Sequence, residues 1–111
     1  MSLSTHVLDT ASGRPAAELR VRCERLDDTH ATALTERDTD ADGRIGDLVS
    51  REDLVVGTYR LTFATGAWAA ANGSTTFYPE VSVTFTVTAD DEHHHVPLLL
   101  SPYGYSTYRG S

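Results

Sequence analysis

The chain has 111 residues, enough for one domain around a single hydrophobic core, and we expect that domain to span residues 1–111. Its formal net charge is −7 and every basic side chain is an arginine, an acidic balance that argues against nucleic acid as a partner. A lone cysteine excludes an intrachain disulfide framework, and no stretch approaches the roughly 20 apolar residues of a membrane span, so we expect a cytoplasmic protein.

The first half of the sequence alternates apolar and polar side chains, which is the two-residue period of a half-buried strand. This pattern predicts strands over residues 3–9, 19–24 and 32–36. Cys23 falls on the apolar side of the second strand, where a cysteine without a partner is a small core residue and not a reactive thiol.

The second half of the sequence has the same strand period, interrupted by one short helix. Residues 65–71 are rich in alanine and predict that helix. Four more strands are predicted, over residues 59–63, 81–88, 93–100 and 103–108. Turns that contain glycine or proline separate these segments. Seven or eight short strands at this spacing indicate an all-β fold, a β-sandwich.

An acidic segment over residues 38–45 imitates the start of a calcium-binding EF-hand loop. It has acids at the first, third and fifth positions and glycine at the sixth. The twelfth position, where such a loop needs a bidentate glutamate, is Val49, and the flanks are not helical in pattern. We therefore interpret Asp42 and Gly43 as a turn between strands, from which Arg44 emerges.

Three consecutive histidines, His93, His94 and His95, lie at the start of the penultimate predicted strand. On a strand, His93 and His95 share one face and His94 takes the other. The pair on one face, with His6 from the first strand, has the residue types of a zinc site. A solvated strand end is the alternative interpretation, and we expect neither a metal nor another cofactor.

His6, Arg44 and His95 together form a further candidate site, because a sandwich can bring a first strand, a turn and a penultimate strand onto one surface. Histidine is suited to take a proton near neutral pH, and arginine binds planar anionic groups through its fork of donors. Composition and spacing predict a histidine and arginine site on a β-sandwich, and they do not identify its substrate.

Several motifs, in order along the chain, resemble those of the transthyretin-like 5-hydroxyisourate hydrolases. Four of them lie at residues 3–10 (LSTHVLDT), 39–44 (TDADGR), 57–61 (GTYRL) and 77–81 (FYPEV). The segment 93–111, HHHVPLLLSPYGYSTYRGS, is similar to the closing signature of the family almost letter for letter. The resemblance covers nearly the whole chain and is weakest over residues 24–37.

This resemblance implies a transthyretin-like sandwich of two four-stranded sheets with one short helix. It also implies a homotetramer whose active sites open onto a channel where pairs of subunits meet. His6 matches the first-strand catalytic histidine of the family, Arg44 its turn arginine and His95 the second histidine of its His-x-His motif. Ser111 matches a terminal serine that lines the site, and we expect Tyr108 and Ser111 to contribute to substrate binding.

The chain departs from the family pattern at two positions. His94 stands where tyrosine is usual, and we expect it to point into the sandwich or toward a neighbouring strand. Asp40 replaces the usual asparagine of the turn, which changes how the turn is capped. Neither departure touches a residue to which the resemblance assigns a catalytic role.

The resemblance implies that the protein hydrolyses the small molecule 5-hydroxyisourate to 2-oxo-4-hydroxy-4-carboxy-5-ureidoimidazoline in urate degradation. Two alternatives remain open at this point. One is a transthyretin-like carrier that binds a small ligand without catalysis, and the other is a zinc hydrolase. Converging imidazoles disfavour an apolar carrier channel, whereas activity that survives chelation would disfavour zinc.

Overall fold

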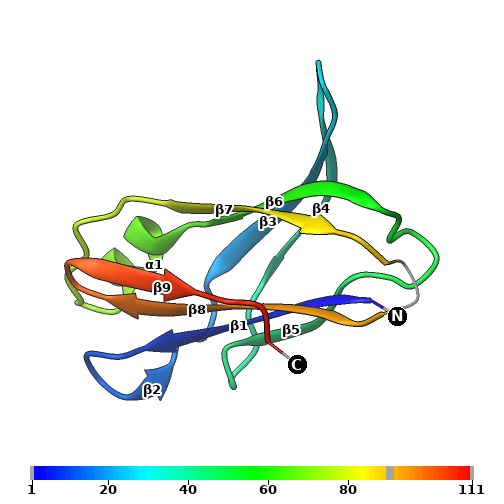
Figure 1. Cartoon of the computed structure of the whole chain (residues 1–111). Coiled ribbons are helices and arrows are strands. Elements are labelled where there is room, and N and C mark those ends of the chain that lie inside the picture. The colour runs from blue at the N-terminus through cyan, green and yellow to red at the C-terminus, as the bar shows by residue number, and fades with distance from the viewer. Residues whose placement is uncertain (1, 90–91, 111) are drawn as a thin grey trace.

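The computed structural model describes residues 2–89 and 92–110 and shows two β-sheets stacked face to face (Figure 1). The first sheet contains β1 (Leu3–Asp9), β2 (Arg14–Pro15), β5 (Arg44–Val49), β8 (His94–Ser101) and β9 (Gly104–Thr107). The second contains β3 (Arg20–Leu26), β4 (Ala31–Asp38), β6 (Gly57–Phe63) and β7 (Val81–Val87). The helix α1 (Thr65–Ala71) lies at one end of the sandwich. The predicted all-β sandwich of two sheets is confirmed, as is the helix.

The structure adds strands that the alternation of the sequence did not predict. β5 was missed because its apolar residues do not alternate: Ile45 is buried, but so are the adjacent Leu48 and Val49. Its register against β1 shifts between Leu3 and Thr5, which changes which side of β5 faces the core. With β5 and the two-residue β2, the first sheet has five strands instead of the expected four.

Alternating side chains of both sheets fill the space between them, as the two-residue period requires. The largest fully buried side chains include Tyr59 and Phe63 of β6 and Leu3 of β1. Trp68 of α1 is buried at the end of this core and packs against it. Cys23 is also buried, and its burial, followed by the charge of Glu24, raises the pKa of its thiol to about 12. The protonated thiol therefore behaves as a small core residue.

β1 is the strand that organises the candidate site. It pairs in parallel with β8 on one side and antiparallel with β5 on the other, so it joins two segments that carry predicted site residues. Leu3, Thr5 and Val7 are buried toward the core, which leaves Ser4 and His6 on the outer face of the sheet. In the part of the chain that the structure describes, no helix is long and apolar enough to cross a membrane.

Candidate active site

His6 and Arg44 lie beside each other on the outer face of the first sheet. They are partners in the antiparallel register of β1 and β5. The turn before Arg44 is fixed against β1, because the Val7 N–H donates to the Gly43 carbonyl over 2.8 Å. Gly43 has a φ of +74°, and a Cβ there would lie 2.5 Å from the Val7 carbonyl oxygen. Glycine at this position therefore allows the close approach that brings Arg44 next to His6.

Asp40 caps the turn that leads into β5. Its Oδ1 atom accepts the backbone N–H groups of Asp42 and Arg44, each over 2.9 Å. The Asp40 N–H in turn donates to the Arg44 carbonyl over 2.9 Å. The acidic segment therefore forms a turn in which the Asp40 carboxylate acts as an Asx-type acceptor. Its backbone contacts orient Arg44 at the start of the strand.

His95 lies on the same outer face, on the other side of β1. Ser4 and His95 are partners in the parallel register of β1 and β8, and the Ser4 hydroxyl lies 2.7 Å from His95 Nδ1. His95 is half-buried, and its pKa is lowered below the ordinary 6.5 by burial first, and then by the nearby charges of Arg44, His6 and His93. The structure thus brings His6, Arg44 and His95 together, and the lowered pKa of His95 favours its neutral form.

His93 belongs to the same cluster, although it precedes the first residue of β8. Its Nε2 atom lies 2.9 Å from the Ser4 hydroxyl and its Nδ1 atom 3.0 Å from the Ser2 hydroxyl. Sequence reasoning placed His93 on the face of His95 but did not single out Ser4. Strand parity was the available signal, because a serine two residues before His6 must share its face.

His94 takes the opposite side of β8, as predicted. Only 3% of its surface is exposed, and it lies on the inner side of the sheet between the layers. Its Nδ1 atom lies 3.2 Å from the Glu92 carbonyl oxygen. Its buried Nε2 atom finds no hydrogen-bond partner among residues 2–89 and 92–110. His94 is therefore a buried residue of the sandwich and lies outside the cluster on the outer face.

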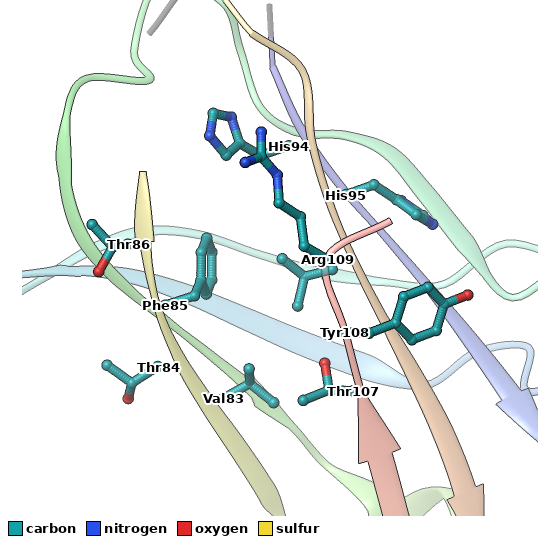
Figure 2. Close-up of a pocket in the computed structure, with 10 residues that line it drawn as sticks. Val83, Thr84, Phe85, Thr86, His94, His95, Thr107, Tyr108 and Arg109 are labelled. Carbon is teal, nitrogen blue, oxygen red and sulfur yellow. The ribbon is translucent and has the colours of Figure 1, made fainter. Parts of the chain in front are cut away.

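A cleft of about 240 Å³ opens between the edge strands β7 and β9 (Figure 2). Val83 and Phe85 of β7 line it, with His94 and the side chain of Arg109. In Figure 2 the side chain of Arg109 extends to the side of β8 that carries His94, whereas the rings of His95 and Tyr108 point to the other side. The Arg109 guanidinium pairs with the Glu92 carboxylate at 2.6 Å. Arg109 thus lies on the cleft side of β8 and points away from His95.

The C-terminal segment lies against His95. The Gly110 N–H donates to the His95 carbonyl over 2.8 Å, which continues the register of β8 and β9 beyond Thr107. A Cβ at Gly110 would lie 2.5 Å from Cδ2 of the His95 ring, so only glycine allows this approach. Tyr108 is 57% exposed. Ser111, the other predicted binding residue of this tail, lies outside the described residues.

The cluster has the residue types of a metal site without its geometry. Within the described ranges 2–89 and 92–110, no group of three or more His, Cys, Asp or Glu side chains is arranged to hold a metal ion. The ring nitrogens of His93 and Nδ1 of His95 point at serine hydroxyls instead. The arrangement suits proton transfer by neutral imidazole beside a fixed cation.

A two-sheet β-sandwich with three imidazoles and a guanidinium on the outer face of one sheet has the residue types of a hydrolytic enzyme. The HIUase/Transthyretin family profile matches residues 3–110. The chain is 53% identical over 113 residues to the 5-hydroxyisourate hydrolase of Caulobacter vibrioides, covering 98% of this chain and 97% of that protein. The chain therefore belongs to the HIUase/Transthyretin family.

Solved structures of two relatives agree with this assignment. The 5-hydroxyisourate hydrolase of Klebsiella pneumoniae is 37% identical, with a TM-score of 0.86 and 100% of both chains covered. Sea bream transthyretin, solved in complex with thyroxine, is 30% identical, with a TM-score of 0.91, covering 99% of this chain and 95% of that one. The fold is thus shared by a hydrolase and by a transthyretin solved in complex with thyroxine, so the fold alone does not decide between these functions.

Proposed function

We propose that this protein is a hydrolase that opens the ring of 5-hydroxyisourate between N1 and C6, giving 2-oxo-4-hydroxy-4-carboxy-5-ureidoimidazoline in urate degradation. The observation that carries the proposal is the meeting of His6, Arg44 and His95, whose pKa is lowered, on one face of a chain about half identical to a 5-hydroxyisourate hydrolase. A locally cationic face on a chain of net charge −7 suits a small, polar, anionic ring better than it suits an apolar ligand.

His95 is proposed as the general base for the attacking water. Its lowered pKa leaves the imidazole unprotonated at neutral pH, which a base requires. His6, on the neighbouring strand β1, orients the same water molecule. Proton transfer by a placed side chain contributes about 10²–10⁴-fold to the rate.

Arg44 is proposed to hold the polar edge of the substrate and to stabilise the oxyanion that forms at the attacked carbonyl. Its side chain is exposed at the start of β5, beside His6. Among the residues that the structure describes, its guanidinium makes no ion pair, so its charge is available to a ligand. The same charge lowers the pKa of His95 and so favours the basic form of that imidazole.

Tyr108 and Ser111 are proposed to form one wall of the substrate site. Support comes from the Gly110–His95 bridge, which fixes the preceding tail residues along β8. Residues added after Ser111 are expected to lower activity more than the same residues added before Met1. Equal activity of the two tagged proteins would mean that the tail does not serve the site.

A homotetramer is proposed as the active form. His6 and Arg44 lie on an open sheet face, where a second subunit would supply the missing walls of a substrate site. The edge strands β7 and β9 also leave backbone groups available for pairing with another chain. Light scattering on the purified protein is expected to give the mass of four chains, and a monomer with full activity would contradict this proposal.

The direct test of the function is the decay of enzymatically generated 5-hydroxyisourate, followed with and without purified protein in the presence of a chelator. We expect clear acceleration over the spontaneous decay, undiminished by the chelator. No acceleration, with or without the chelator, would exclude the hydrolase and favour the carrier. Acceleration that is seen without the chelator and is lost when the chelator is added would favour the zinc mechanism.

A further inference from the structure

A continuous line of hydrogen bonds crosses the outer face from His93 to His95. The Ser2 hydroxyl lies 3.0 Å from His93 Nδ1, and the Ser4 hydroxyl lies 2.9 Å from His93 Nε2. The same Ser4 hydroxyl lies 2.7 Å from His95 Nδ1. Ser4 is therefore the only link between the two imidazoles in this line, and it leaves Nε2 as the ring nitrogen of His95 that can face a substrate.

Ser4 is held firmly in this position. It is only 7% exposed, and its Cα is the partner of His95 in the parallel register of β1 and β8. The next residue, Thr5, points the other way and donates its hydroxyl to the Val96 carbonyl over 2.6 Å. A buried hydroxyl without a hydrogen-bond partner lowers the free energy of unfolding, and here each of the two imidazole rings supplies a partner for Ser4. The backbone on both sides thus fixes the Ser4 Oγ atom between His93 and His95.

When the rings of His93 and His95 are both neutral, the single proton of the Ser4 hydroxyl couples their tautomers. A hydroxyl that donates to one ring nitrogen must accept from the other. When Ser4 donates to His93 Nε2, it accepts from Nδ1–H of His95, and His95 Nε2 then has a free lone pair. When Ser4 donates to His95 Nδ1, the proton of His95 must lie on Nε2. Only the first arrangement makes His95 a base toward the substrate.

We propose that Ser4 is a positioning residue that, with His93 as its acceptor, fixes His95 in the tautomer whose Nε2 lone pair faces the substrate. The proposal rests on the function proposed above for His95. During the reaction the water proton goes to Nε2, while Nδ1 keeps its own proton and its hydrogen bond to Ser4. The imidazolium that forms is therefore stabilised by bonds that already exist, without rotation of the Ser4 hydroxyl.

None of the charged side chains described near His95 makes a hydrogen bond to its ring, so none of them can set its tautomer in place of Ser4. Arg44 of β5 and His6 of β1 act on His95 through their charge. Arg109 of the tail is paired with Glu92 on the cleft side of β8. Among the residues of the described chain, only Ser4 makes a hydrogen bond to a ring nitrogen of His95. The tautomer of His95 thus depends on its hydrogen bond with one neighbour, Ser4.

Nitrogen-15 NMR of the histidine rings tests the proposal without a substrate, at a pH where the imidazoles are neutral. In the wild-type protein we expect His95 to carry its proton on Nδ1, and in Ser4→Ala we expect a mixture of both tautomers. A wild-type proton on Nε2, or an unchanged Nδ1–H tautomer in Ser4→Ala, would overturn the proposal. This result is independent of whether 5-hydroxyisourate is the substrate, so the two proposals fail separately.

Kinetics supply the second readout. Ser4→Ala is expected to lower kcat by about tenfold or more while KM changes by less than about twofold, because Arg44 still binds the substrate. Ser4→Thr restores a hydroxyl with a residue that strands favour, and we expect it to recover kcat to within about threefold of wild type. Failure of Ser4→Thr to recover activity, in a protein whose His95 tautomer is restored, would show that the tautomer does not limit catalysis.

Two further variants separate positioning from packing. His93→Phe removes the acceptor of the Ser4 proton. The kcat of the double variant Ser4→Ala/His93→Phe should be no lower than that of the slower single variant, because both changes act through the hydrogen bond between Ser4 and His93. Ser82→Ala is the matched control: this strand serine makes a single side-chain bond, 3.3 Å to Thr62, in the other sheet. Its activity should equal wild type, and additive losses in the double variant would contradict the proposal.

Discussion

The two sides of β8 show how one residue type acquires two roles. His94 and His95 are neighbours in the chain, but His94 is buried between the sheets and His95 lies on the outer face beside Ser4. The inner side offers His94 apolar surroundings and leaves its Nε2 atom without a partner among the described residues. The outer side offers His95 a hydroxyl, a guanidinium and two more imidazoles. Neighbours, and not the residue type, therefore determine what each imidazole can do.

The largest effect is expected when the histidine on each side of β8 is replaced in turn. His95→Asn removes the proposed base, and we expect kcat/KM for 5-hydroxyisourate to fall by about 10²–10⁴-fold. His94→Phe should keep near-wild-type activity, because His94 faces the core. Its free energy of unfolding should rise by about 1 kcal/mol, since a buried nitrogen without a partner is removed next to a cleft of about 240 Å³. Equal losses of activity in both variants would remove the distinction between the two sides.

A smaller effect is expected from the glycine that touches the outer histidine. Gly110→Ala would place a methyl group 2.5 Å from Cδ2 of His95, so the ring must move. A displacement of about 1 Å at a reacting group can lower activity by about 10²-fold, and we expect a loss of between about 10- and 100-fold with the fold unchanged by circular dichroism. Gly104→Ala is the control, because a Cβ there meets no atom within 4 Å. Normal activity of Gly110→Ala would show that the His95 ring tolerates other positions.

The smallest effect concerns the pKa of His95. Arg44→Ala removes a cation that lowers this pKa, so the NMR titration midpoint of His95 should move upward, toward the ordinary 6.5. Because burial is the larger cause, the midpoint should stay below 6.5. An unchanged midpoint would mean that Arg44 does not act on His95.

The sign of the stability effect follows from the same shift. The unfolded chain binds the His95 proton at a higher pH than the folded chain does. The contribution of His95 to the free energy of unfolding is therefore fully present above pH 6.5, and it is lost as the pH falls through the lowered folded-state pKa. Denaturant unfolding of wild type and Arg44→Ala at several pH values measures this loss, which should be smaller in the variant.

Strand parity accounts for what the sequence predicted well. It separated His94 from His95 and put Cys23 in the core, while the turn residues Asp42 and Gly43 put Arg44 after a turn, and the structure agrees at each residue. Parity failed at β5, where a register shift against β1 breaks the alternation. It also could not reveal that Ser4 bridges two histidines, because that contact depends on the parallel pairing of β1 with β8. The fold and the main cluster could be predicted, whereas the hydrogen bonds that orient the cluster required the topology.

The parallel pairing of β1 with β8 also has a kinetic consequence. The hydrogen bond between Ser4 and His95 joins residues 91 positions apart in the chain. Contacts of such long range form slowly, because the loop between them must close before the contact can stabilise it. No isolated hairpin of this protein contains both residues, so partly folded states should lack the site altogether. Recovery of activity during refolding would then report completion of the first sheet, later than signals from the β3–β4 hairpin.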